Sequence, residues 1–208
     1  IWQGPEYWLA TFEDGSQAWY GATKSGDSNA RSPIEYNIVK WKDAQGNYIT
    51  YNYTQSNNVA VISSIQWGGN ETISKAHFNQ IIFNYATRDL KEQSYVNGVS
   101  FIQDKILSNV VVNANGSQFK KYLIEYTKDP NGNQYQFVNK ITEYNAANEA
   151  ANPVIFEQQK DKSTSTLGNN NAFNFDDVKL SGDFDGNGAI DNIVYAYSKQ
   201  ITCYSPAP

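Results

Sequence analysis

Apolar and polar side chains alternate along most of the chain, and glycine, asparagine and aspartate interrupt the alternation at short intervals. A period of two places one set of side chains on each face of a β-strand. Gly-containing pairs such as Asp14-Gly15 supply the positive φ angles of a tight hairpin turn. The pattern therefore predicts two early hairpins, one pairing residues 7–12 with 17–20 and the next pairing 34–42 with 48–53 around 43–47.

The same alternation continues through most of the next hundred residues. It predicts further strands at 59–67, 78–85, 105–112, 118–127, 135–144 and 153–158. Residues 74–79 and 145–151 are expected to form a helical turn or two each, without a sustained apolar stripe. The connections are too short for parallel crossovers. We therefore expect an all-β fold, mostly an antiparallel sheet of successive hairpins.

A polar stretch divides the chain near its C-terminal end. Residues 160–171 are almost free of apolar anchors and rich in Asn, Ser and Thr, as linkers and surface loops are. We predict a β-rich hairpin domain at 1–159 and a linker at 160–175. The remaining residues, 176–208, are expected to start a propeller-like second module.

Composition and charge exclude several classes of function. Hydrophobic residues make up 40% of the chain and charged residues 18%, which suits a packed domain better than a disordered one. The net charge is −5 with no basic stripe, so nucleic-acid binding is not expected. No apolar run reaches the length of a membrane-spanning helix. One cysteine, Cys203, cannot form an internal disulfide.

The region 183–191 carries the clearest chemical motif. Asp183, Asp185, Asn187 and Asp191 stand at loop positions 1, 3, 5 and 9, and all four have oxygen-bearing side chains. Calcium takes roughly six to eight oxygen ligands, and the backbone carbonyl of Ala189 at position 7 would add another. The sequence therefore predicts a structural calcium site made by these five residues.

The residues after this loop separate it from an EF-hand. An EF-hand places a bidentate acid at position 12, where this chain has Val194. Residues 192–197 alternate like a strand rather than a helix. The loop resembles the calcium loops of the FG-GAP or VCBS type, which precede a strand in β-propeller blades.

A series of weak motifs in a fixed order resembles one known family. It is the N-terminal, plasmid-virulence-B-like region of insecticidal toxin-complex B subunits and of Rhs/YD-repeat-related secreted proteins. The resemblance implies a non-catalytic shell or scaffold segment of a large secreted or surface bacterial protein, with other domains or toxin-complex subunits as partners. The absence of Met and of a signal peptide also favours an excised internal fragment. The matching segments are 8–15, 19–21, 45–53, 62–68, 82–85, 88–89, 95–98, 121–126 and 154–157.

Two other functions stay open. The five tryptophans and many tyrosines favour a carbohydrate-binding or adhesive module if their rings are exposed. A glycosidase would need two carboxylates at a suitable separation, which sequence spacing does not reveal. No catalytic residue is assigned, because the single histidine, His77, stands beside no nucleophile motif and is expected to be exposed or at a strand edge. The carboxylates considered for glycosidase chemistry are Glu13, Asp14, Glu35, Glu125 and Glu143.

Overall fold

The computed structural model describes residues 7–23, 29–128, 135–157, 178–182, 190–196 and 200–204. Backbone contacts divide the chain into two compact units. The first unit contains Ile1–Lys128 with Gln134–Gln158, and the second contains Asp129–Asn133 with Gln159–Pro208. Each unit forms a sheet of its own.

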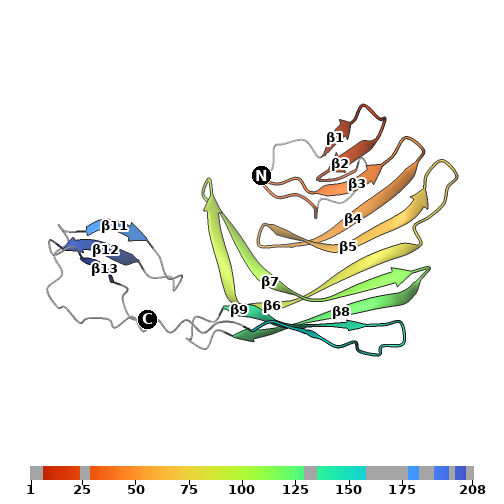
Figure 1. Ribbon diagram of the computed structural model, residues 1–208. Helices are drawn as coiled ribbons and strands as arrows, with labels where there is room; N and C mark the ends of the chain where they lie inside the picture. The colour runs from red at the N-terminus through yellow and green to blue at the C-terminus, as the bar shows by residue number, and fades with distance from the viewer. Residues whose placement is uncertain are drawn as a thin grey trace. The chain divides into compact units, whose positions relative to one another are not determined.

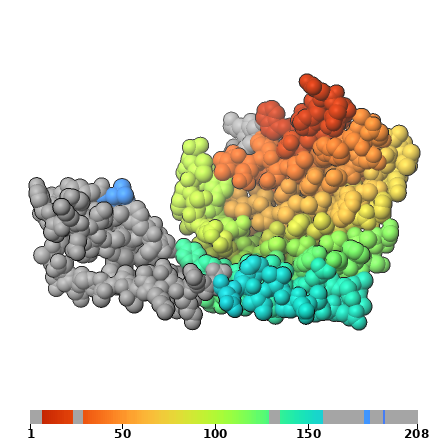
Figure 2. Space-filling view, viewed as in Figure 1, coloured from red at the N-terminus to blue at the C-terminus, as the bar shows by residue number. Residues whose placement is uncertain are grey.

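The first unit is a ten-stranded antiparallel sheet in which the strands pair in chain order (Figure 1). Each strand pairs only with the strands before and after it, so successive strands form consecutive coloured bands on the surface (Figure 2). The strands are β1 Trp8–Thr11, β2 Gln17–Tyr20, β3 Ile38–Lys42, β4 Asn47–Ser56, β5 Val59–Asn70, β6 Asn79–Val96, β7 Val99–Ala114, β8 Ser117–Lys128, β9 Gln136–Tyr144 and β10 Val154–Ile155.

Local turn chemistry accounts for the hairpin connections. The β6–β7 turn places Asn97 at φ 50° and Gly98 at φ 77°, and the β7–β8 turn places Asn115 at 50° and Gly116 at 79°. Two consecutive positive φ angles match the right-handed twist of the flanking strands, and Asn and Gly tolerate them best. Gly15, at φ 78°, closes the β1–β2 turn by donating its N–H to the Phe12 carbonyl at 3.0 Å.

The all-β antiparallel prediction is confirmed, including the early hairpins. Two of its details are wrong. The segments 74–79 and 145–151 contain turns and isolated bridges, with Asn79 already in β6, and no residue in the described ranges is helical. Strands β6 and β7 run far beyond 78–85 and 105–112, because residues 86–104 continue the hairpin without regular apolar alternation. The described residues accordingly include no helix able to cross a membrane.

A β-bulge interrupts the pairing of β2, β4, β6 and β8 with the strand that follows each of them. The pairing shifts immediately before a tyrosine in every case, leaving one extra residue on the following strand. Because a shift of one residue exchanges the two faces of a strand, these bulges decide which side chains share a face. The four tyrosines are Tyr20, Tyr53, Tyr85 and Tyr126.

Three of these tyrosines bond back to the preceding strand. The Tyr53 hydroxyl donates to the Ile38 carbonyl at 2.9 Å, and the Tyr85 hydroxyl donates to the Ile62 carbonyl at 2.8 Å. The Tyr126 hydroxyl likewise donates to a carbonyl of β7, that of Leu107, at 2.7 Å. Ile38, Ile62 and Leu107 are themselves the register partners of Tyr20, Tyr53 and Tyr85. The result is a tyrosine ladder that crosses the sheet beside the bulges.

The long β6–β7 hairpin bends where its pairing is most irregular. Register jumps from Thr87 opposite Lys105 to Glu92 opposite Gln103. Beyond this bend the hairpin rises toward the β4–β5 turn (Figure 1). The Ile102 N–H donates to the Asn57 carbonyl at 3.2 Å there, and the Asn58 side chain donates to the Ser100 carbonyl at 3.0 Å. These bonds curve the sheet without adding a second layer.

The two faces of the sheet differ in polarity. Residues directly opposite one another on paired strands share a face. One face carries apolar rows, including the row Tyr51, Ile65, Ile81 and Val112 and the row Phe83, Val110 and Tyr122. All of these side chains are only half-buried. The buried hydrophobic residues of the described chain are Ala18, Ala22, Ala30 and Phe101.

The second unit contains a three-stranded antiparallel sheet. Its strands are β11 Val178–Gly182, β12 Asp191–Ala196 and β13 Gln200–Tyr204. Gly182 pairs with Asp191, so the predicted calcium loop joins two neighbouring antiparallel strands. The strand expected after the loop is confirmed, and a propeller built on it stays a prediction.

Replacing Tyr53 with Phe removes a hydroxyl that donates to the Ile38 carbonyl, whereas replacing Tyr51 with Phe removes no hydrogen bond among the described residues. We expect Tyr53→Phe to lower the free energy of unfolding by about 0.5–1.5 kcal/mol, as for a typical intramolecular hydrogen bond. The matched control, Tyr51→Phe, should cost clearly less. Urea titrations of the two variants measure the difference, and equal costs would contradict a stabilising role for the ladder.

Candidate functional site

A row of polar side chains crosses the more polar face of the first unit. Register places Thr50, Gln66, Gln80, Asn113 and Gln118 opposite one another on five successive strands, β4 to β8. Neighbouring strands lie about 4.8 Å apart, so the row presents one polar group at each such step. We call the three central members, Gln66, Gln80 and Asn113, the amide row.

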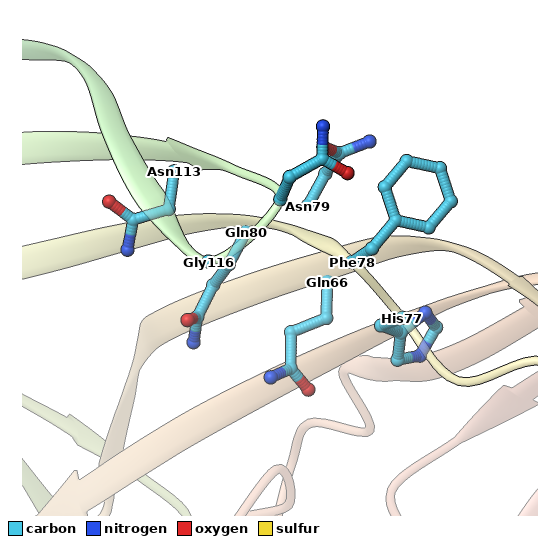
Figure 3. Close-up of a pocket in the computed structure, with 8 residues that line it drawn as sticks. Gln66, His77, Phe78, Asn79, Gln80, Asn113 and Gly116 are labelled. Carbon is cyan, nitrogen blue, oxygen red and sulfur yellow. The ribbon is translucent and has the colours of Figure 1, made fainter. Parts of the chain in front are cut away.

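The amide row borders a cavity of about 500 Å³. Figure 3 shows these three side chains projecting to the same side of the sheet, while Asn79 projects to the opposite side. None of the lining residues carries a charged group apart from the titratable imidazole of His77. The cavity is lined by Gln66, His77, Phe78, Asn79, Gln80, Asn113, Asn115 and Gly116.

His77 is packed into the sheet at one end of this cavity. Its Nε2 lies 2.5 Å from Thr50 Oγ1, and its ring lies 4.1 Å from the Tyr48 ring between centroids. Gly69, the register partner of Tyr48, leaves room for both rings, because a Cβ at Gly69 would meet the Tyr48 ring and lie 3.0 Å from His77 Nδ1. His77 is therefore half-buried and stands just before β6 begins, so of the two expectations for it only that of an exposed side chain is wrong.

The electrostatic setting of His77 favours the neutral imidazole. Nδ1 is buried without a hydrogen-bond partner in the described part of the chain. Burial, and secondly the positive charge of Lys40, lower the pKa of His77 below its usual 6.5. We assign the ring proton to Nε2, where it can donate to Thr50, leaving Nδ1 as an unpaired acceptor. A neutral histidine with no carboxylate on Nδ1 lacks the orienting partner found in catalytic triads.

Two lysines and one glutamate lie beside the histidine. Lys40 forms an ion pair with Glu71, and Lys42 Nζ approaches the other carboxylate oxygen of Glu71 at 3.3 Å. The Lys40 ammonium also lies 4.9 Å from the centre of the Trp19 ring and 5.3 Å from that of Tyr48. The hydrogen bond from Lys40 is the main reason why the pKa of Glu71 is lowered. The ammonium groups of Lys40 and Lys42 therefore contact the Glu71 carboxylate and are not free to bind an anion.

Several carboxylates considered for glycosidase chemistry are likewise engaged. Glu125 pairs with Lys140 at 2.6 Å and Glu143 pairs with Lys120 at 2.6 Å, in both cases across β8 and β9. The hydrogen bond from Lys120 lowers the pKa of Glu143, and hydrogen bonds from Ser16 lower the pKa of Asp14. A general acid needs a raised pKa, so Glu143 and Asp14 are poorly suited to that role.

Most of the predicted calcium ligands lie outside the described residues. This applies to Asp183, Asp185, Asn187 and Ala189. Asp191 is the first residue of β12. Elsewhere, no three His, Cys, Asp or Glu side chains of the described chain gather as metal ligands would. The calcium site therefore stays a prediction.

The four tryptophans that the structure describes do not form a common stacking surface. Trp8 is 57% exposed, and its ring meets Tyr36 edge-on at 6.2 Å. Trp19 lies beneath Lys40, while Trp41 and Trp67 are half-buried on β3 and β5. Trp2 lies outside the described residues. The structural argument for sugar stacking on tryptophan is thus weak, whereas the amide row, which composition did not single out, forms an organised polar surface.

Comparison with solved structures finds similar folds at low sequence identity. The N-terminal domain of effector protein SpvB from Salmonella typhimurium strain LT2 matches with a TM-score of 0.53 and 13% identity, over 67% of this chain and 61% of that domain. The crystal structure of TcdB2-TccC3-Cdc42 matches with a TM-score of 0.56 and 11% identity, over 97% of this chain. A Tc holotoxin pore from Photorhabdus luminescens matches with a TM-score of 0.58 and 11% identity, also over 97% of this chain.

These likenesses establish the fold of the chain. They confirm the expected relation to toxin-complex folds, although no protein-family model and no curated protein matches the sequence. The chain spans 61% of the SpvB domain and 14% of each of the two Tc chains. What those whole proteins do is therefore a matter for proposal.

The lowered pKa of His77 gives a pH dependence with a definite sign. In the unfolded chain the imidazole binds its proton near pH 6.5, whereas in the folded chain it does so only at lower pH. The unfolded state thus binds more protons in this window, so stability falls as pH falls through 6.5. We expect the melting temperature to drop more between pH 7.5 and 5 in the parent chain than in His77→Gln.

Lys75→Gln is the matched control for this measurement, because it changes a neighbouring side chain and leaves the imidazole of His77 in place. Its melting temperature should follow the same pH slope as the parent chain. A slope in His77→Gln as steep as the parent's would contradict the burial of a neutral imidazole.

Proposed function

We propose that this chain is a non-catalytic structural segment of a large secreted or surface toxin-like protein, forming part of its shell or scaffold. The observation that carries the proposal is the incompletely buried apolar face of the ten-stranded sheet, whose side chains are half-buried. A domain normally buries such a face against a second layer. The described part of the first unit contains no second layer, so we infer that other segments of a larger polypeptide or toxin-complex subunits cover it.

The apolar face extends across several strands of the sheet. The Tyr51–Val112 row and the Phe83–Tyr122 row both cross β6 and β7. They lie side by side on one face of the sheet. Soluble monomers rarely leave contiguous apolar patches of more than a few hundred Å² uncovered. At the β10 edge Val154, which is 60% exposed, adds to this face, because its register partner Ile141 pairs in turn with Ile124.

The comparisons with solved structures support the proposed structural role. Two of the similar folds belong to Tc toxin chains of which the matched region is 14%, so in those proteins the fold is one section of a much longer chain. The ion pairs of Glu125 and Glu143 and the neutral His77 favour a structural role over an acid–base one. We propose the same kind of structural role here, with Rhs-type or propeller sections as neighbours along the parent chain.

For the second unit we propose a structural calcium site in the 183–191 loop. The loop sequence joins two paired antiparallel strands, whereas an EF-hand loop joins two helices. A cation bound there would hold the ends of β11 and β12 together. Because a metal bound only by the folded state stabilises it by mass action, calcium should raise the stability of this unit.

Exposure of the apolar face predicts binding of a hydrophobic dye. We expect the chain to enhance the fluorescence of anilinonaphthalene sulfonate, and Ile81→Thr with Val112→Thr to reduce the enhancement by about half or more, since dye binding follows the exposed apolar area. The control pair, Ile82→Thr with Val111→Thr, alters the opposite face of the same strands and should reduce it less. Equal effects of the two pairs would contradict a specific apolar face.

The calcium proposal predicts a thermal shift. Addition of millimolar calcium should raise the melting temperature of the second unit, and Asp185→Ala should abolish the rise by removing a charged ligand. Asp161→Ala, which changes an acidic residue outside the loop, should leave it unchanged. Differential scanning calorimetry with and without chelator makes the measurement, and a full calcium response in Asp185→Ala would place the site elsewhere.

A further inference from the structure

The amide row consists of hydrogen-bonding groups that the protein itself does not use. Other amides of the sheet are engaged: Asn52 donates to Ser64 at 3.0 Å, and Asn84 donates to Asn109 at 2.8 Å. By contrast, the side chains of Gln66, Gln80 and Asn113 form no hydrogen bond with any described residue. All three are half-buried, and all three border the 500 Å³ cavity.

The amides of the row remain accessible to solvent, since the buried side-chain atoms without a partner among the described residues belong to His77 and Thr142. Their donors and acceptors are therefore available to a ligand. Each carboxamide offers an acceptor oxygen and two N–H donors side by side. Three of them in register therefore present a repeating donor and acceptor pattern, with a step of about 4.8 Å between strands. Such a pattern suits a ligand that carries many hydroxyl groups, since every hydroxyl can both donate and accept.

The charge of the site narrows the class of ligand. No Lys, Arg, Asp or Glu lines the cavity. Of the lysines close to its lining residues, Lys40 pairs with Glu71, and Lys75 Nζ lies 4.4 Å from the centre of the Phe78 ring. A phosphate or sulfate would require free cations. An apolar small molecule would require a mainly hydrophobic lining, which this cavity lacks. A neutral polyhydroxylated ligand is the class that remains.

We propose that the amide row and its cavity bind a neutral oligosaccharide, with Gln66, Gln80 and Asn113 hydrogen-bonding to sugar hydroxyls. The row extends over two strand spacings, about 10 Å, so it contacts a chain of sugars more fully than one ring. His77 closes one end of the cavity, where the Nε2–Thr50 contact fixes its ring. The site lies on the more polar face, opposite the apolar face of the structural proposal, so the two can operate together.

The test is a titration of the 208-residue chain with three neutral hexasaccharides, those of cellulose, chitin and starch, followed by NMR of the side-chain amide groups. The expected result is saturable shifts of the Gln66, Gln80 and Asn113 amide signals with at least one of them. Gln80→Ala should weaken that binding by about tenfold or more, as expected when a hydrogen-bonding partner of a polar ligand is removed.

Two further variants guard against an effect of misfolding. Asn84→Ala removes an amide of the same strand that is already bonded to Asn109, and it should leave sugar affinity unchanged. Gln80→Glu keeps the size of the side chain but replaces its N–H donors with a charged oxygen, and it should also weaken binding while retaining the melting temperature.

Three outcomes would overturn the proposal. The first is the absence of saturable binding to all three neutral hexasaccharides. The second is binding that Gln80→Ala leaves unchanged. The third is tighter binding of an anionic heparin hexasaccharide than of any neutral one, which would mean that the site recognises charge. None of these results depends on the apolar face, so failure here leaves the structural proposal to its own test.

Discussion

Strand register, set by four β-bulges beside tyrosines, is the constraint on which the rest of the first unit depends. Side chains alternate between faces with a period of two, so each one-residue shift reassigns every following pair. The bulges at Tyr53 and Tyr85 occur where hydroxyl groups bind carbonyls of the preceding strand. These bonds hold the register that gathers aliphatic and aromatic residues on one face and unpaired amides on the other.

A one-layer sheet must obtain its stability largely within the layer. Backbone pairing, cross-strand ion pairs such as Lys120–Glu143, and tight Asn-Gly turns provide it here. Each exposed ion pair contributes only about 0–1 kcal/mol. The apolar side chains gain only part of the free energy that full burial would give. A covering partner would complete that burial, which is the physical reason for regarding the sheet as one section of a larger assembly.

The hairpin turns were predicted correctly from the sequence, because they depend on residues that are close together in the chain. Gly15 and the 43–47 segment marked hairpins correctly, because positive φ angles restrict the residues that can form such turns. The extension of β6 through Arg88, Asp89 and Glu92 was missed, because these charged residues lack apolar alternation and the pairing with β7 resumes only at Glu92. Neither the buried environment of His77 nor the amide row was foreseeable, since both depend on cross-strand neighbours far apart in the chain. The calcium ligands remain a sequence prediction.

The similarity to solved structures concerns the fold of this chain, whereas the functional proposals concern its side chains. The resemblance to the SpvB domain and Tc chains concerns backbone arrangement at 11–13% identity. The half-buried apolar face and the unpaired amides are properties of this chain's own residues. Both proposals therefore rest on side chains that can be altered one at a time, without assuming that the similar proteins share a ligand or a partner.

Hydroxyl-radical footprinting of the chain alone and of its complete parent polypeptide tests the central claim most directly. The structural account predicts that Ile81, Phe83 and Tyr122 react readily in the chain alone and become protected in the parent polypeptide. The solvent-facing Tyr95, which is 68% exposed on the β6–β7 hairpin, serves as an internal reference. Equal reactivity of the apolar face in both samples would mean that nothing covers it, and the scaffold role would be contradicted.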